Sequence, residues 1–321
     1  MRRPLYGGQA VIEGVMMRGP RDMVVAVRSP SGRIVVHSEE LRGSIYTGRW
    51  SRLPVVRGSV TLWDTLVLGM RTLLFSANVA LESEDTPKDG STPVQPAMPT
   101  GVLWGTMIFA LAAATGLFFV TPVLIMGVLD RFISSSLVSN LVEKVIRLGL
   151  ILGYIGGIGL LPEIRRVFAY HGAEHKAVNA HEAGAPLEVE SVRRFTTVHP
   201  RCGTTFLIVV VLVSFVVFAA LGQPPLLLRV ISRVVLIPLI AGLAYELIRL
   251  AASHYGNGLV RAVLAPGLAV QTLTTREPGD SQLETAIAAL KAVLAAETER
   301  AEAPAAPVPT GLALSPDEAA S

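Results

Sequence analysis

Four long apolar stretches dominate the hydrophobic pattern of the chain. They cover residues Gly101–Leu129, Val145–Leu161, Gly203–Gly222 and Val230–Leu250. An α-helix needs about 20 mostly apolar residues to cross the hydrocarbon core of a bilayer, and these stretches approach or exceed that length. The composition agrees, because 51% of the 321 residues are hydrophobic and only 17% are charged, against about 25% charged in soluble domains. The pattern predicts an α-helical membrane protein with about four transmembrane helices.

A different pattern occupies residues 1–81, which we expect to form a small cytoplasmic α+β region. Apolar and polar residues alternate in Met23–Arg28 and Arg33–Leu41 around a Gly-containing turn, which predicts a β-hairpin. The stretch Gly58–Leu81 is apolar but includes one acidic and one basic residue. It predicts either an amphipathic helix on the membrane surface or a helix packed on the hairpin.

Basic residues predict the orientation of the four spans. Six of them lie between the second and third apolar stretches: Arg165, Arg166, Lys176, Arg193, Arg194 and Arg201. The other two connections carry two basic residues each, Arg131 with Lys144 and Arg229 with Arg233. At the start of the second stretch, Lys144 and Arg147 are expected to reach a membrane surface. Because cytoplasmic loops are enriched in Lys and Arg, we expect residues 163–202 to be a His-rich cytoplasmic loop. Both termini are then also cytoplasmic, and the protein is a multi-pass protein of the cell membrane.

The remaining segments complete the predicted organisation. Residues 82–100 are rich in charges and proline and predict a flexible linker, and the membrane domain follows over 101–261. In a C-terminal segment, 262–297, Asp280 or Ser281 is expected to cap an amphipathic helix. Its apolar side consists of Leu283, Ile287, Leu290 and Leu294. The Ala- and Pro-rich tail, 298–321, is expected to be disordered.

The stretch Tyr170–Cys202 concentrates the candidate chemistry. It holds four of the six histidines and the only cysteine. His171 and His175 are one helical turn apart, with Glu174 beside them. This His-x-x-Glu-His pattern supplies two metal ligands and a general base in some metalloproteases. We therefore expect His171 and His175 to bind a divalent metal ion, with Zn²⁺ the expected metal, and Glu174 to be the catalytic base.

A catalytic zinc usually has three protein ligands, so the third must come from another part of the chain. The predicted topology brings His199, Cys202 and Glu246 to the same membrane level, and the choice among them stays open. Glu246 has an equally weighted alternative, an ion pair with Arg249 one turn away. For the His171 cluster the alternative is a solvated helix end without a ligand.

Four long motifs carry a resemblance to a known family. They are YGGQAVIEGVMMRGP at residues 6–20, YHGAEHKAVNAHE at 170–182, HPRCGTTF at 199–206 and LTTREPGDSQLETAIAAL at 273–290. Together they closely resemble the YqhQ-like family, bacterial membrane proteins whose shared domain has no established function. Members are described as predicted metal-dependent enzymes. The matching motifs contain the candidate residues His171, Glu174, His175, His199 and Cys202. The N-terminal motif also contains Glu13.

Two functional classes fit these features. The first is a membrane-embedded, metal-dependent enzyme, hydrolytic in type, that acts at the cytoplasmic membrane surface on an apolar or membrane-anchored substrate. The alternative is a non-enzymatic assembly factor or small carrier in which the cluster is a structural metal site or a partner-binding site. Besides the lipid bilayer and such a substrate, no nucleic acid partner is expected, because the net charge is only +3 and the arginines are dispersed.

Overall fold

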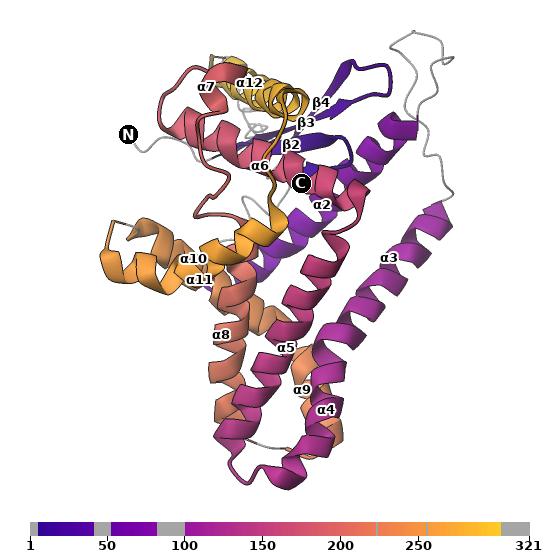
Figure 1. Cartoon of the computed structure of the whole chain (residues 1–321), viewed down its shortest axis with the longest axis vertical. Coiled ribbons are helices and arrows are strands. Elements are labelled where there is room, and N and C mark those ends of the chain that lie inside the picture. The colour runs from indigo at the N-terminus through magenta and orange to yellow at the C-terminus, as the bar shows by residue number, and fades with distance from the viewer. Residues whose placement is uncertain (1–5, 42–52, 82–99, 223, 255, 303–321) are drawn as a thin grey trace, which may run out of the picture.

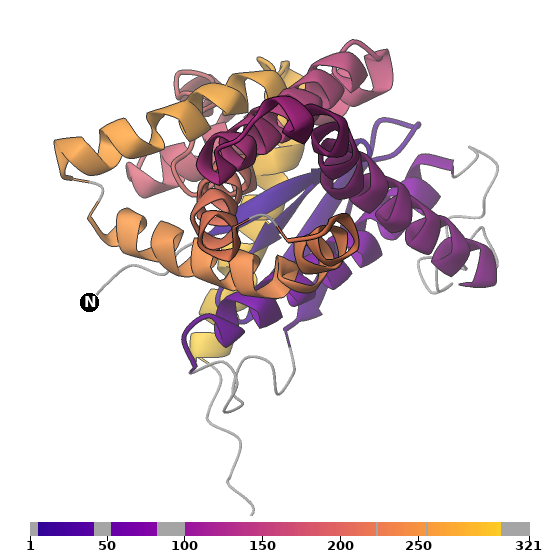
Figure 2. The same ribbon diagram turned by 90° about the horizontal axis from the view of Figure 1, so that it is seen from below.

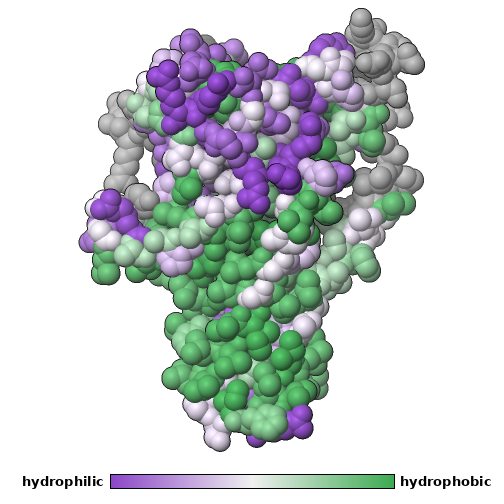
Figure 3. Space-filling view, in the orientation of Figure 1, coloured by the Kyte–Doolittle hydropathy of each residue, from purple (hydrophilic) through white to green (hydrophobic). Residues whose placement is uncertain are grey.

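The structure is a computed structural model that describes residues 6–41, 53–81, 100–222, 224–254 and 256–302. It is mostly helical and has one four-stranded sheet near the N-terminus. Figure 1 shows two parts, a layer that contains the sheet and an elongated helical bundle below it. The space-filling view separates the same parts by hydropathy, with a polar surface over the sheet region and an apolar surface over the bundle (Figure 3).

The sheet is an antiparallel meander of four strands, β1 (Gly7–Val11), β2 (Gly14–Arg18), β3 (Asp22–Arg28) and β4 (Ile34–Glu40). The predicted hairpin is confirmed as β3 and β4, and Gly32 in its turn has a φ of +82°. The predicted hairpin is only half of the sheet, however, because the Gly-rich motif at residues 6–20 forms the two further strands β1 and β2. Strand β1 pairs only with β2 and is therefore an edge strand.

Helices cover both faces of the sheet. On one face, Val24 and Ala26 pack with Leu283 and Leu290 of helix α12 (Asp280–Glu302) in a core that also includes helix α6 (Pro162–Glu182). On the other face, Met23, Val25 and Val27 of β3 pack with Leu68 of helix α2 (Val56–Leu81). Of the two alternatives for the 58–81 stretch, packing on the sheet is therefore what the structure shows, although Trp63 on α2 is 62% exposed.

The bundle consists of the apolar helices of the chain. They are α3 (Thr100–Thr115), the π-helical turn η2 (Gly116–Val120), α4 (Thr121–Leu129), the short η3 (Asp130–Phe132), α5 (Ser136–Ile158), α8 (Gly203–Leu221), α9 (Leu226–Val235), α10 (Ile237–Ser253) and α11 (Gly258–Thr274). Figure 2 looks up into this bundle from below. Among the described residues, three helices are long and apolar enough to cross a membrane, namely Val56–Leu81, Gly105–Phe132 and Gly203–Leu221, and two bent helix pairs raise the number to as many as five.

Two of the expected spans differ from the observed helices. The stretch expected to begin at Val145 belongs to α5, which begins at Ser136. Its basic residues Lys144 and Arg147 were expected near a membrane surface, but they are 4% and 3% exposed and lie inside the bundle. The stretch expected as one span from Val230 is divided into α9 and α10, which meet at 48°. Pro238, which lacks a backbone N–H, stands in the first turn of α10.

The expected His-rich loop is largely helical. Helix α6 turns by 103° from α5 and returns across the sheet, and the short helix α7 (Val189–Val192) follows it. The C-terminal amphipathic helix includes Asp280, one of the two residues expected to cap it, as its first residue. It continues to Glu302, so the first residues of the expected tail are helical. The rest of that tail, 303–321, and the expected linker, apart from Thr100, lie outside the described residues.

Candidate metal centre

Helix α6 carries the His-x-x-Glu-His motif to the edge of the sheet. The rings of His171 and His175 lie on one face of α6, with their centroids 4.4 Å apart. Strand β1 passes directly over the motif, because a Cβ on Gly8 would lie 3.0 Å from Cγ of Glu174 and 2.3 Å from the carbonyl oxygen of Met16. Glycine at position 8 therefore allows the edge strand to approach the motif closely.

Both histidines of the motif are oriented by backbone carbonyl groups. Nδ1 of His171 lies 2.9 Å from the carbonyl oxygen of Thr274, and Nδ1 of His175 lies 2.5 Å from that of Thr197. Because a carbonyl oxygen only accepts hydrogen bonds, Nδ1 of each ring carries the proton. Each Nε2 then keeps a free lone pair, which is the arrangement typical of metal-binding histidines.

Cys202 supplies a third donor atom. Its Sγ lies 3.3 Å from Nε2 of His171, and the donor atoms of His171, His175 and Cys202 all lie within 4.8 Å of one another. A tetrahedral zinc ion with Zn–N of about 2.1 Å and Zn–S of about 2.3 Å would separate such atoms by about 3.5 Å. Two imidazoles and one thiol at this spacing therefore fit a divalent ion such as zinc.

A buried glutamine positions the segment that contains His199 and Cys202. The side chain of Gln271, on α11, accepts a hydrogen bond from the backbone N–H of His199 at 2.9 Å. It donates to the carbonyl oxygen of His199 and to Oγ1 of Thr205, both at 2.8 Å. Gln271 is fully buried. Gln271 was not among the residues predicted from sequence, where its one signal was an amide within an apolar segment.

Glu174 lies next to the three donor atoms, and its side chain is buried. The residue is 4% exposed, and its Oε2 lies 3.5 Å from Nε2 of His175. Burial raises the pKa of the Glu174 carboxyl to about 7, although His171 and a hydrogen bond from the backbone N–H of Gly8 act in the opposite direction. A carboxyl with this pKa can accept or release a proton at neutral pH.

His199 is the fourth candidate ligand near the cluster. Its ring lies 5.7 Å from that of His175, centroid to centroid. Nε2 of His199 is buried and makes no hydrogen bond with any described residue, since the nearest carboxylate, Oε2 of Glu182, is 3.6 Å away. Burial, followed by the charge of Arg201, lowers the pKa of His199 to about 4. The ring is therefore neutral at pH 7 and keeps a lone pair.

The structure does not bring Glu246 to this cluster. Its carboxylate pairs with Arg57 of α2, with 2.6 Å between Nε of Arg57 and Oε1 of Glu246. This contact also differs from the expected pair with Arg249. Glu13 is likewise occupied elsewhere, since it accepts a hydrogen bond of 2.7 Å from Nε of Arg166. Neither acidic residue belongs to the set of donor atoms around Cys202.

The candidate centre opens into a cavity of about 680 Å³ between β1, α6 and the start of α8. Its lining includes His171, Glu174, His175, His199 and Cys202 together with residues of the N-terminal motif, Tyr6, Gly7, Gly8, Gln9, Arg18 and Gly19. Of that motif, only Glu13 was singled out from the sequence. The glycines of the motif could have indicated that it lines the cavity, because a backbone that packs closely against another segment needs residues without a side chain.

Comparison with known proteins gives the family but no activity. Residues 53–296 match the family described as "Protein of unknown function (DUF1385)". The chain is also 32% identical over 303 residues to "Uncharacterized protein YqhQ" of Bacillus subtilis strain 168, and the aligned region covers 92% of this chain and 93% of the relative. No solved structure matches the chain significantly. The chain therefore belongs to the YqhQ-like family of uncharacterised proteins.

Proposed function

We propose that this protein is a membrane-embedded, metal-dependent hydrolase that acts at the cytoplasmic membrane surface. One observation carries the proposal: the donor atoms of His171, His175 and Cys202 lie within 4.8 Å of one another, beside a buried carboxyl group whose pKa is about 7. All of these groups line one cavity. Metal-type ligands and a tuned base around a common space are what metal-assisted hydrolysis requires.

His171, His175 and Cys202 would hold the ion, with Zn²⁺ the best fit to two imidazoles and a thiolate. When bound, a divalent ion supplies Lewis acidity, which polarises a substrate oxygen and lowers the pKa of water. Glu174 takes the proton from water and passes it to the leaving group, because its pKa near neutrality suits both directions of transfer. The backbone of β1 lies against the Glu174 side chain, since a Cβ on Gly8 would be 3.0 Å from Cγ of Glu174.

The arrangement of the sheet layer supports an even number of membrane crossings. The core on one face of the sheet contains strands from the N-terminus, α6 from the middle of the chain and α12 from its end. These three parts must lie on the same side of a membrane. The α3–α4 segment and α5 would supply two crossings before α6, and α8 with the bent α9–α10 pair would supply two after it. The basic residues of α6 and the segment after it favour the cytoplasmic side.

The position of the centre favours an apolar or membrane-anchored substrate. Cys202 directly precedes α8, whose 19 residues include no charged side chain. The candidate metal ligands therefore lie where a membrane helix would leave the bilayer. A substrate held in the membrane can reach this level by lateral diffusion, whereas a soluble substrate gains nothing from the location.

A non-enzymatic role is the second candidate, and His199 is the observation that favours it. If Nε2 of His199 joined the three other donors, the ion would have four protein ligands and no open position, as in structural zinc sites. The cluster would then stabilise the junction of α6 and α8 in an assembly factor or small carrier.

Metal analysis and activity measurements on the detergent-purified protein test the proposal. We expect about one divalent ion per chain in the wild type and in Glu246→Gln, which removes a carboxylate outside the cluster, and none in the His171→Ala/His175→Ala variant. Against membrane-anchored esters, amides and phosphodiesters, Glu174→Gln should keep the metal and lose activity by about 100-fold or more. Equal metal content in the double-histidine variant would overturn the metal centre. A metal-loaded wild type that is inactive on every substrate would favour the structural role.

A further inference from the structure

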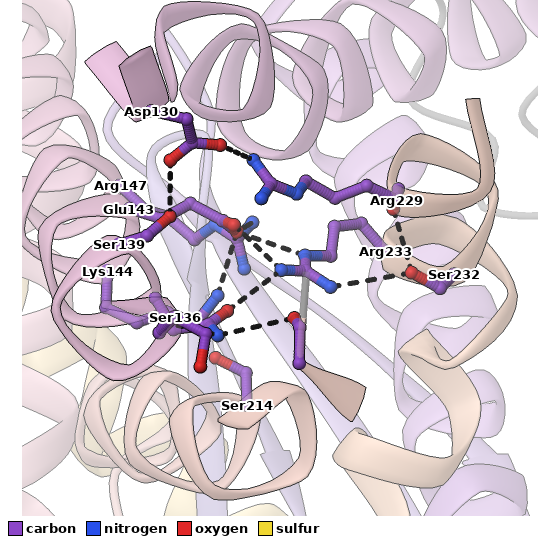
Figure 4. A network of polar contacts seen from close by, with 12 residues as sticks. Asp130, Ser136, Ser139, Glu143, Lys144, Arg147, Ser214, Arg229, Ser232 and Arg233 are labelled. Carbon is purple, nitrogen blue, oxygen red and sulfur yellow. Dashed lines mark hydrogen bonds and ion pairs between the residues drawn. The ribbon is translucent and has the colours of Figure 1, made fainter. Parts of the chain in front are cut away.

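A second group of charged side chains lies inside the helical bundle, far from the candidate metal centre. We refer to it as the buried basic cluster, and its members are Asp130, Glu143, Lys144, Arg147, Arg229 and Arg233. They come from α5, α9 and η3, and Figure 4 shows their side chains converging on one another. Except for Asp130, at 25%, none of these side chains is more than 6% exposed.

Glu143 is the centre of the cluster. Its Oε1 accepts hydrogen bonds from Nζ of Lys144 at 2.9 Å, from Nη2 of Arg147 at 2.9 Å and from Nε of Arg233 at 3.1 Å. Three positive side chains therefore share one carboxylate oxygen. The second acidic group, Asp130, is already paired with Arg229 at 2.5 Å.

The cluster carries more positive charge than its acidic members can neutralise. Four basic side chains against two carboxylates leave a formal net charge of +2 among the described residues. The donors are also in excess, because Nε of Arg147 and Nε of Arg229 are buried and find no acceptor in the described part of the chain. Unpaired charge and unpaired donors in an apolar bundle are costly unless an anion accompanies them.

Aromatic rings partly compensate for this charge but cannot neutralise it. The guanidinium carbon of Arg233 lies 3.8 Å from the ring centroid of Phe218, and Nζ of Lys144 lies 4.6 Å from it. Arg147 lies 5.0 Å from the ring of Phe119. Phe119 belongs to the π-helical turn η2, and such turns occur frequently at functional sites.

We propose that the buried basic cluster binds an oxyanion of the phosphate type. A phosphate group can carry two negative charges, which matches the surplus of the cluster, and its oxygens accept the N–H groups that arginine presents. Nε of Arg147 and Nε of Arg229 are the donors left for it. The anion is either the head group of a phospholipid or free phosphate, since both present the same chemistry.

The cluster lies toward the end of the bundle away from the sheet. Asp130, the most exposed member, precedes the turn between η3 and α5, and α9 begins at the same end (Figure 1). Along α5, Glu143 is separated from Ile158, the last residue before the turn to α6, by about 22 Å at 1.5 Å per residue. The oxyanion site is thus independent of the candidate metal centre, and its test does not depend on hydrolase activity.

Thermal unfolding of the full-length protein in an uncharged detergent tests this proposal. One arm compares sodium phosphate with sodium chloride at equal ionic strength. The other compares dihexanoyl phosphatidic acid with dihexanoyl phosphatidylcholine. We expect the midpoint to rise by about 3 °C or more with the phosphate-bearing ligand. A rise in both arms indicates that free phosphate suffices, and a rise in the lipid arm alone indicates a head-group site.

Two substitutions make the result specific to the cluster. Arg147→Gln should abolish the rise, whereas Arg131→Gln, an exposed arginine at the same end of the bundle, should preserve it. If Arg147→Gln does not yield folded protein, Lys144→Gln removes a neighbouring charge and should also abolish the rise. A wild type whose midpoint moves in neither arm, or a folded cluster variant that responds fully, would overturn the oxyanion site.

Discussion

Sγ of Cys202 lies 3.3 Å from Nε2 of His171, although 31 positions separate the two residues in the chain. Cys202 is also the only cysteine of the protein. Any thiol chemistry measured on the whole chain therefore reports on the candidate metal centre alone. Alkylation of this single thiol can therefore be used to test metal binding.

Alkylation of Cys202 should depend on the metal. A thiolate bound to zinc is a poor nucleophile toward maleimide, so we expect labelling of the metal-loaded protein to be at least about 10-fold slower than that of the chelator-treated protein. Mass spectrometry of the intact chain measures the rate. His175→Ala should label quickly with or without added zinc. Equal rates for the loaded and stripped wild type would argue against thiolate ligation.

The burial of Glu174 predicts an unusual pH dependence of stability in the metal-free protein. Its pKa in the folded state, about 7, lies above the ordinary value of 4.5, so the folded state favours the protonated carboxyl. The contribution of Glu174 is therefore most favourable below pH 4.5 and is lost as the pH rises through 7, by up to about 3 kcal/mol. Glu174→Gln lacks this loss.

Thermal unfolding of chelator-treated wild type and Glu174→Gln between pH 5 and pH 8 measures the effect. The variant should gain stability relative to the wild type as the pH rises. His199 contributes in the opposite sense, because its lowered pKa makes its contribution disappear as the pH falls from 6.5 toward 4, but this effect is common to both proteins. A difference that stays constant over the whole range would contradict the assigned pKa.

Two adjacent glycines of β1 provide a matched pair of substitutions. A Cβ on Gly8 would lie 2.3 Å from the carbonyl oxygen of Met16 and 3.0 Å from Cγ of Glu174, whereas a Cβ on Gly7 would meet nothing within 4 Å. Gly8→Ala should therefore destabilise the protein by about 1–3 kcal/mol and reduce metal content, because β1 must move away from α6. Gly7→Ala should resemble the wild type in both measurements, and similar losses in the two variants would contradict this account.

Gln271 should be needed for metal binding although it touches none of the three donor atoms. Gln271→Leu removes its three hydrogen bonds to His199 and Thr205 and leaves buried backbone groups unpaired, at a cost of about 1–3 kcal/mol. We expect weaker zinc binding in a competition titration with a chelator, because the segment before Cys202 is no longer held in place. Thr272→Val, an exposed neighbour, is the control. Unchanged zinc affinity in Gln271→Leu would mean that the segment is held by other contacts.

The predicted orientation can be tested with one introduced cysteine. In a Cys202→Ser background, Ser191→Cys should be protected from a membrane-impermeant thiol reagent in intact cells and labelled after lysis. The expectation rests on the six basic residues between the second and third apolar stretches. Labelling in intact cells would reverse the orientation.

The sequence predicted features that depend on local spacing. His171, Glu174 and His175 are close in the chain, and one helical turn suffices to bring the two imidazoles together. Strands β1 and β2 were missed because neither GGQAV nor GVMMR alternates between apolar and polar residues, and alternation was the pattern that predicted the hairpin. In β2 this absence has a physical reason, because four of its five residues are buried.

Partners that lie far apart in sequence could not be predicted. Glu246 was a reasonable ligand by topology, but its carboxylate is taken by Arg57, which is 189 positions away. The same limit applied to Lys144 and Arg147. They lie not at a membrane surface but inside the bundle, where they share the carboxylate of Glu143 with Arg233, which is 90 positions from Glu143.

Helix α12 has a consequence for how the chain matures. Val24 and Ala26 of β3 are buried against Leu283 and Leu290, so the first strands made during synthesis share a core with the last described helix. All the bundle helices are synthesised between them. Until α12 leaves the ribosome, one face of the sheet lacks its cover and exposes apolar side chains. A nascent chain that stops before Asp280 should therefore expose the surface that folding chaperones and quality-control proteases recognise, even when its apolar bundle helices are already formed.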